Sequence, residues 1–126
     1  MILIGFALYK NRIASLFENS TELGVYCDKS EKWELVECIG FDVPDAFNKV
    51  RILKKANLDI LICGAITWEI ATLIDKSGIS LYPWISGNID EVLDAFKNGQ
   101  IDGFIMPGFN KHRKRWGRCW RRVRIN

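Results

Sequence analysis

The segment Cys63-Gly64-Ala65-Ile66 places a thiol and a glycine at the end of a short apolar run. The run predicts a buried parallel strand followed by a helix, and open α/β sheets bind ligands beyond the carboxyl ends of such strands. A helix N-terminus here would lower the pKa of Cys63 and favour the thiolate, which binds metals or attacks electrophiles. The alternative is that Cys63 is a small apolar core residue and that Gly64 is a steric necessity.

A second segment of interest, residues 82–88, contains a strand end, a proline, an aromatic ring and a Ser-Gly turn before a helix. If this loop lies beside Cys63, the two segments form a ligand pocket. Its expected lining residues are Gly64, Ala65, Trp84, Ser86 and Gly87. Trp84 fits the edge of a core equally well, and the spacing does not decide between the two interpretations.

Weaker candidate metal ligands follow toward the C-terminus: Met106, His112 and Cys119. His112 is the only histidine and stands among basic residues, which disfavour its protonation, so a surface histidine without function is the alternative. The cysteines form no C-x-x-C pair, which argues against a zinc finger or a ferredoxin-type site. We expect reduced thiols at Cys27, Cys38, Cys63 and Cys119.

Charge is divided sharply along the chain. The 126 residues carry a net charge of +3, but all 15 acidic residues precede position 110, together with ten of the 18 basic ones. That part therefore has a net charge of −5, and the remaining eight bases stand in a stretch without any acid. They are Lys111, Arg113, Lys114, Arg115, Arg118, Arg121, Arg122 and Arg124.

We call residues 109–126 the basic tail. Trp116, Cys119, Trp120 and Val123 fall at the spacing of one helical face, so a helical tail would be basic and amphipathic. Such a segment binds nucleic-acid phosphates, an anionic membrane surface or an acidic protein partner. The alternatives are a solvated tail and one that folds back on the acidic body. Charge alone shows attraction to anions and does not identify the anion.

Catalytic signatures are missing from the sequence. It contains no G-x-S-x-G, no P-loop and no G-x-G-x-x-G. A Ser/His/Asp triad would need His112, which lies in the basic tail. We therefore expect a protein that is not an enzyme.

The elements that would position these residues follow a consistent order. Strands are expected at 2–9, 23–27, 33–39, 59–64 and 79–82, and helices at 44–56, 68–76 and 89–98. The order β-β-β-α-β-α-β-α predicts a mixed sheet flanked by helices, in a ribonuclease H-like arrangement. We expect one domain over residues 1–108, followed by a flexible tail over 109–126.

Hydropathy favours a cytoplasmic protein. No apolar run reaches the roughly 18 residues that a membrane-spanning helix needs. The apolar start, Met1 to Tyr9, has no basic segment before it and no small-residue cleavage site after it, so it predicts a first strand rather than a signal peptide.

Four segments together resemble a known family. Residues 11–18, Asn-Arg-Ile-Ala-Ser-Leu-Phe-Glu, resemble its N-R-V/I-S-P-x-F-D loop, and residues 61–66 resemble its L-I-C-G-A/G-I strand end. Residues 83–92 resemble its P-W turn and following helix, and Met-Pro-Gly at 106–108 resembles its frequent ending. The family is the dinitrogenase iron-molybdenum cofactor biosynthesis family, which includes NifX, NifY and the C-terminal part of NifB.

The resemblance implies a ribonuclease H-like fold and an accessory role in carrying or inserting an iron-sulfur or iron-molybdenum cluster, with a cluster-assembly protein as partner. It adds Arg12 to the expected pocket. Family members that handle the nitrogenase cofactor often have a histidine in an H-F-G triplet of the first loop, where this chain has Leu16, Phe17 and Glu18. The alternative function is an interaction module whose basic tail binds nucleic acid or an acidic protein.

Overall fold

The computed structural model describes residues 2–29, 32–43 and 45–106. Within them a six-stranded mixed sheet forms the centre of the molecule, in the order β4-β3-β1-β5-β6, with β2 paired to β1. The strands are β1 (Leu3–Tyr9), β2 (Arg12–Ile13), β3 (Glu22–Lys29), β4 (Lys32–Gly40), β5 (Ile60–Ile62) and β6 (Ser80–Tyr82). β1, β3 and β4 pair antiparallel, whereas β1, β5 and β6 run parallel.

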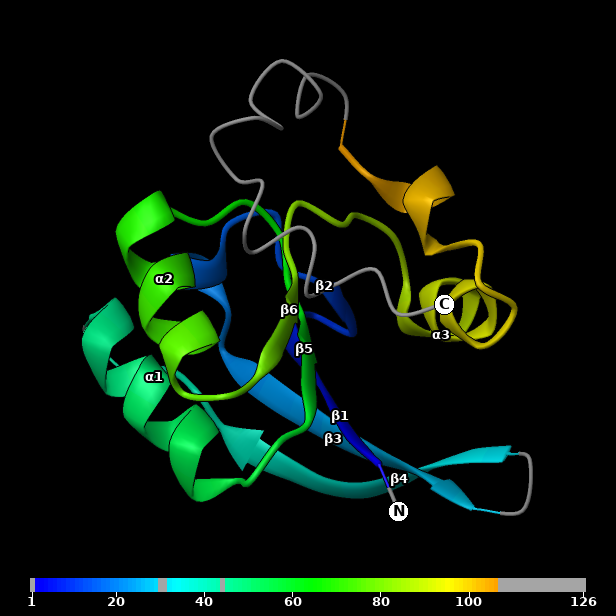
Figure 1. The fold of residues 1–126 in the computed structure, drawn as a ribbon, viewed down its shortest axis with the longest axis horizontal. Coiled ribbons are helices and arrows are strands. Elements are labelled where there is room, and N and C mark those ends of the chain that lie inside the picture. The colour runs from blue at the N-terminus through cyan, green and yellow to red at the C-terminus, as the bar shows by residue number, and fades with distance from the viewer. Residues whose placement is uncertain (1, 30–31, 44, 107–126) are drawn as a thin grey trace.

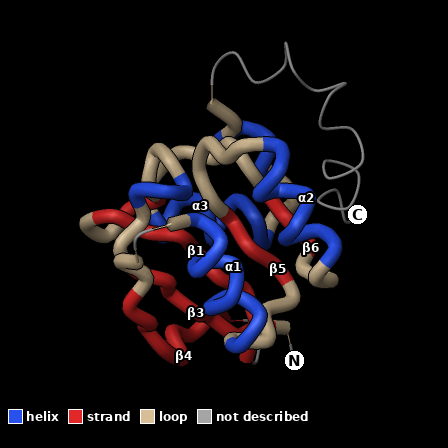
Figure 2. The backbone as a smooth tube through the Cα atoms, turned by 90° about the vertical axis from the view of Figure 1, so that its left-hand side faces the viewer, coloured by secondary structure: helices blue, strands red, loops and turns tan. Residues whose placement is uncertain are grey.

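Three helices cover the sheet on its two faces. α1 (Ala46–Lys55) and α2 (Trp68–Lys76) lie on one face, and α3 (Ile89–Lys97) lies on the other (Figure 1). Seen from the side of α1 and α2, these two helices stand in front of the strands (Figure 2). β1 runs through the middle of the core and is buried over five consecutive residues, because both of its faces are covered. Its sequence is accordingly apolar throughout rather than alternating.

Each helix begins at a side-chain cap. Asp45 accepts a hydrogen bond from the Asn48 backbone N–H at 2.9 Å, and Thr67 caps α2. Asn88 accepts from the Glu91 N–H at 2.9 Å while its amide donates back to the Glu91 carboxylate. Asn88 is thus the N-cap of α3 and fixes where this helix starts, with the Glu91 carboxylate bonded to the cap side chain rather than to its backbone N–H as in a capping box.

Two features differ from the sequence-based expectation. The segment expected as a polar loop between the first two strands contains β2 and a 3-10 turn, η1 (Phe17–Asn19). α1 begins at Ala46, with Asp45 as its cap, two residues after the expected start at position 44. The order of the other strands and helices agrees with the expected meander and the β-α units that follow it.

A second 3-10 turn, η2 (Ile101–Phe104), follows α3. The described chain then ends at residue 106, at the end of the sheet where β1, β5 and β6 have their carboxyl ends (Figure 1). The expected domain boundary at residue 108 and the basic tail lie outside the described residues. In the described part of the chain, no helix is both long enough and apolar enough to cross a membrane.

Candidate functional site

Two adjoining hollows lie at the carboxyl ends of the parallel strands. The first, here called the apolar cleft, measures about 250 Å³ and is lined by Leu16, Glu18, Ala65, Ile66, Thr67 and Trp84. The second, the polar pocket, measures about 540 Å³ and is lined by Tyr9, Ala14, Ser15, Leu16, Glu18, Asn19, Ser20 and Asp42. Leu16 and Glu18 line both. This is the edge of the sheet at which open α/β folds bind ligands.

The loop after β2 is held against the loop after β5 by backbone hydrogen bonds. The Ala65 N–H donates to the Ser15 carbonyl at 2.8 Å, and the Phe17 N–H donates to the Ala65 carbonyl at 2.8 Å. A side chain at Gly64 would place its Cβ within 2.6 Å of the Ser15 carbonyl oxygen and closer still to that of Ala14. Only glycine fits between these loops.

The loop after β6 completes the site from the other side. The Trp84 N–H donates to the Gly64 carbonyl at 2.9 Å, and the Ile85 N–H donates to the Cys63 carbonyl at 3.0 Å. Trp84 has a φ of +63°, a left-handed conformation that is strained for a bulky side chain and costs about 1–3 kcal/mol. In this conformation the half-buried side chain of Trp84 forms one wall of the apolar cleft.

Cys63 lies inside the core and not in the cleft. Its relative exposure is 0%, and its thiol lies 3.5 Å from the Gly64 carbonyl oxygen. Desolvation raises the pKa of the thiol well above its ordinary value, which disfavours the thiolate. α2 begins at Trp68, five residues after Cys63, so Cys63 does not stand in the first turn of this helix. The alternative interpretation, a small apolar core residue, describes the packing that the structure shows.

Of the other expected pocket residues, Ala65 and Trp84 line the apolar cleft, and Gly64 lies directly behind it. Ser86, Gly87 and Arg12 line neither of the two hollows formed by the described residues. Ser86 donates its N–H to the Phe104 carbonyl at 2.9 Å, and the Gly87 carbonyl accepts from the Ile13 N–H at 3.1 Å. Arg12 is exposed on β2. The backbones of Ser86 and Gly87 help to position the loop after β6, and a binding role for these three residues stays a prediction.

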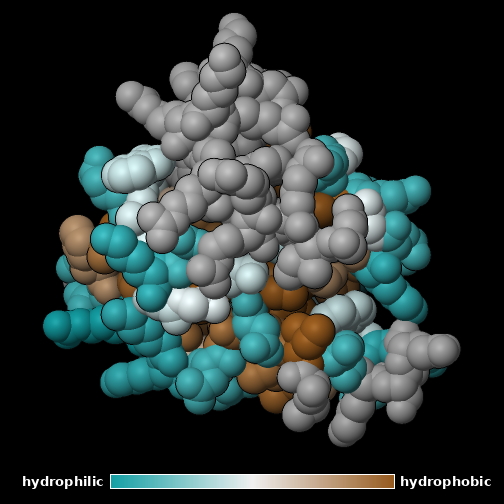
Figure 3. Space-filling view, in the orientation of Figure 1, coloured by the Kyte–Doolittle hydropathy of each residue, from teal (hydrophilic) through white to brown (hydrophobic). Residues whose placement is uncertain are grey.

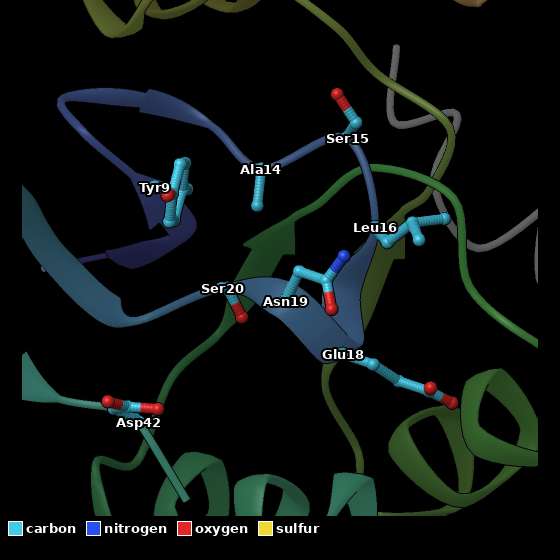
Figure 4. Close-up of a pocket in the computed structure, with 8 residues that line it drawn as sticks. All are labelled: Tyr9, Ala14, Ser15, Leu16, Glu18, Asn19, Ser20 and Asp42. Atoms are coloured by element: carbon cyan, nitrogen blue, oxygen red, sulfur yellow. The ribbon is translucent and has the colours of Figure 1, made fainter.

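The structure adds lining residues that were not assigned to the pocket from the sequence. Leu16 is 49% exposed, and its side chain points in the same direction as that of Glu18, away from Asp42 (Figure 4). Ile66 and Thr67 continue the surface toward the start of α2. The signal for Leu16 and Glu18 was present in the resemblance, because they occupy the triplet where family members have histidine.

The charged side chains among the described residues that line the two hollows are both acidic, Glu18 and Asp42. The nearest buried cation, Lys49, is 1% exposed and donates to the Phe41 carbonyl at 2.9 Å and to the Ser20 carbonyl. Desolvation lowers the pKa of Lys49, and the attraction of Asp42 and Glu18 opposes that shift. Lys49 thus anchors the floor of the polar pocket to α1 and does not enter it.

Side-chain coordination of a metal finds little support in this part of the chain. The described residues contain no group of three or more His, Cys, Asp or Glu side chains able to hold a metal ion. Cys27 is buried, and Cys38 is exposed with its thiol 3.1 Å from the Glu22 carboxylate, a hydrogen bond that raises the pKa of the thiol. His112, Cys119 and the arginines of the basic tail lie outside the described residues, so their expected roles stay predictions. Met106 is half-buried where the described chain ends.

Among known proteins, this chain is similar to several solved structures by its fold. It matches no protein-family model and no curated protein sequence. Among solved structures it is similar to PH0822, with a TM-score of 0.77 and 16% identity over 87% of this chain and 99% of that one. It is also similar to a protein of Methanocaldococcus jannaschii described as a "putative dinitrogenase", with a TM-score of 0.62 and 17% identity over 79% of this chain and 91% of that one.

A third similar structure is the apo form of the orange protein from Desulfovibrio gigas, with a TM-score of 0.64 and 15% identity over 80% of this chain and 91% of that one. Identities this low show a shared fold. The description of the M. jannaschii protein contains the word dinitrogenase, which also occurs in the name of the family that the four sequence segments resemble.

Proposed function

We propose that this chain is a non-catalytic accessory protein that binds or carries a small metal cluster, of the iron-sulfur or iron-molybdenum type, as its cargo in the apolar cleft. The observation that carries the proposal is the cleft itself. It lies at the carboxyl ends of the parallel strands and is built from the segments around Leu16, Ala65 and Trp84 that resemble the cofactor-biosynthesis family. The similarity to the dinitrogenase-like protein and to the orange protein supports this class of cargo.

We also assign a ribonuclease H-like arrangement to the fold. An antiparallel meander of β1, β3 and β4, followed by β5 and β6 added in parallel next to β1, supports this assignment. The nuclease chemistry of such folds is not part of the proposal, because β1 reads Leu-Ile-Gly-Phe-Ala-Leu-Tyr and contains no carboxylate for a catalytic metal.

Binding in this cleft differs from thiolate coordination. Cys63, the expected ligand, is fully buried and does not line the cleft, and burial raises the pKa of its thiol, so it is not a ligand in this proposal. The cleft would hold a preformed cluster by its outer atoms, through contact with Leu16 and Trp84 and through the partial positive charge at the start of α2. We expect the protein to exchange its cargo with a cluster-assembly protein in the cytoplasm.

The test is metal analysis after anaerobic purification with iron and molybdate supplied. Wild type should retain iron near one cluster per chain, with charge-transfer absorption. Leu16→Trp fills the mouth of the cleft and should lower the bound iron at least tenfold. Leu35→Trp, at a similarly exposed position on β4, should retain the iron of wild type. Cys63→Ala should also retain it. Metal-free wild-type protein would refute the proposal, and loss of iron in Cys63→Ala alone would assign the cluster to a different site.

A further inference from the structure

The described chain ends at the wall of the apolar cleft. The Met106 N–H donates to the Trp84 carbonyl at 2.7 Å, and Ile105 pairs with Ile85 in an isolated bridge. Trp84 itself lines the cleft. Twenty residues follow Met106 in the sequence, and they start from this point. Trp116 is ten residues further on, a span of up to about 33 Å when extended, so every part of the cleft and of the polar pocket is within reach.

The surface at the cleft is apolar with an acidic edge. Leu16 is 49% exposed, and Trp68, the first residue of α2 and next to Thr67, is 48% exposed. Glu18 and Asp42 supply the charge of the lining, and the part of the chain before position 110 has a net charge of −5. An occupant that matches this surface combines aromatic side chains with positive charge.

The basic tail has that composition. It contains eight bases, no acid, and Trp116 and Trp120 spaced between arginines. Arginine and lysine contribute most where they pair with carboxylates beside an apolar contact that excludes water. Apolar contact for the tryptophans and carboxylates for the arginines are both present at this edge of the sheet.

Another groove of the described residues fits the tail less well. It lies between β4 and α3 and is lined by Lys32, Trp33, Asp90, Leu93, Asp94 and Lys97. Its two lysines stand beside its two aspartates, so it offers no excess of negative charge. Hydrophobic surface is visible below α3 in Figure 3 as well, but exposed apolar area alone does not favour a cationic segment.

We propose that residues 109–126 dock on the apolar cleft of their own chain, with a tail tryptophan over Leu16 and Trp84 and the arginines beside Glu18 and Asp42. This inference rests on the proposed function, because the docked basic tail occupies the cleft and the metal cluster must displace it. An anionic cluster that displaces the tail would free its arginines from Glu18 and Asp42. The same arginines could then pair with the cluster.

Disulfide trapping in the full chain tests the docking. Cys119 lies between the two tail tryptophans, and the exposed Cys38 is removed as Cys38→Ser. Leu16→Cys should form an intramolecular disulfide with Cys119 at least tenfold faster than Leu35→Cys, which is exposed to a similar degree on β4. About 0.5 M salt should slow the reaction of Leu16→Cys toward the control rate. Equal rates at low salt, or only interchain disulfides, would overturn the proposal.

Hydrogen exchange gives a second measurement that does not depend on the engineered cysteine. Replacing both tail tryptophans, Trp116→Ala with Trp120→Ala, should speed exchange severalfold over residues 14–20 and 64–68 and leave the β3–β4 hairpin unchanged. Unchanged exchange at the cleft would contradict docking. Both measurements are made without iron or molybdate. If they show no docking, cluster binding can still be tested by metal content. If wild type proves metal-free, these two measurements still test docking of the tail.

Discussion

Gly64 occupies the tightest point of the candidate site, where the loop after β5 meets the carbonyls of Ala14 and Ser15. A methyl group there meets backbone atoms, which cannot rotate away as a side chain does. We expect Gly64→Ala to lower the free energy of unfolding by more than about 2 kcal/mol, measured by urea denaturation. Gly40→Ala is the control, because a Cβ at Gly40 has no neighbour within 4 Å, and it should cost well under about 1 kcal/mol. Similar losses in both variants would contradict this account.

Lys49 is a buried cation whose partners are backbone carbonyls. It joins the 17–20 turn and Phe41 to α1, and its ammonium also lies 4.9 Å from the centre of the Phe41 ring. Lys49→Met keeps the aliphatic chain but removes the donor to the Ser20 and Phe41 carbonyls, of which, among the described residues, only Phe41 keeps a second donor, the Val43 N–H, and this should cost about 1–3 kcal/mol in unfolding free energy. Lys54→Met, exposed on the same helix, should cost less than about 0.5 kcal/mol. Equal losses of unfolding free energy in Lys49→Met and Lys54→Met would contradict the role of Lys49 in joining these segments.

The lowered pKa of Lys49 also has a consequence for pH dependence. Desolvation lowers that pKa in the folded state, so the unfolded chain holds this proton up to a higher pH. Stability rises with pH wherever the unfolded state binds more protons, here between the lowered pKa and the ordinary value of about 10.4. The unfolding free energy of wild type should therefore increase relative to Lys49→Met as the pH rises toward about 10.4. A difference that stays flat or falls over this range would contradict the sign of the shift.

Cys63 shows how far sequence reasoning reaches at the scale of one residue. Its position at the end of a buried parallel strand was predictable from the apolar run before it. Its orientation was not, because residues 60–64 are all buried and a strand covered on both faces has no alternation to reveal which way a side chain points. The start of α2 at Trp68 was predicted, but not that Thr67 would be its cap and the loop before it would line the cleft.

At the scale of elements, α3 was the most predictable, since Asn88 is its N-cap and its apolar residues repeat at helical spacing. We expect Asn88→Ala to lower the unfolding free energy by about 1 kcal/mol, and hydrogen exchange in the first turn of α3 to speed up accordingly. Asn98→Ala at the C-terminal end of the same helix should change stability by less than about 0.5 kcal/mol. If both asparagines gave the same loss, the cap would not be the cause.

The β1–β2 hairpin was missed for a specific reason. Lys10 and Asn11 both have positive φ, +51° and +65°, as the two central residues of a tight hairpin turn require. Lysine is an unusual residue in that conformation, so the sequence carries only half of the usual turn signal. The hairpin and η1 matter for function because they bring Leu16 and Glu18 to the cleft.

For the whole molecule, the order of strands and helices followed from hydrophobic periodicity and turn residues, but the joining of three distant loops into one site did not. That joining depends on backbone hydrogen bonds between residues some fifty positions apart, such as Ala65 to Ser15. Periodicity reports which face of an element is buried and carries no information on such contacts. The family resemblance indicated this grouping, because the segments that carry it, around Leu16, Ala65 and Trp84, lie side by side in the structure.

The separation of charge along the chain also predicts behaviour of the whole molecule. Single-stranded DNA should bind the full chain at about 50 mM salt and lose at least tenfold in affinity at about 200 mM, because contacts with phosphates release counterions. Replacing all eight bases of the basic tail by Gln should abolish the binding, since the rest of the chain has a net charge of −5. Fluorescence anisotropy measures both. Binding that persists in this variant would place the DNA site on the body of the protein.

The mutual hydrogen bonding of the loops at the cleft has a kinetic consequence. Ala65 is hydrogen-bonded to Ser15 and Phe17 of the loop after β2. Trp84 is hydrogen-bonded to Gly64 and Met106, so no one loop can swing outward without breaking bonds to another. The mouth of the cleft therefore opens by rotation of side chains such as Leu16, on the nanosecond timescale of exposed rotamers, and not by millisecond movement of a lid. These loops should thus add no slow opening step of their own, so displacement of the docked basic tail should set the rate at which a small molecule enters the cleft.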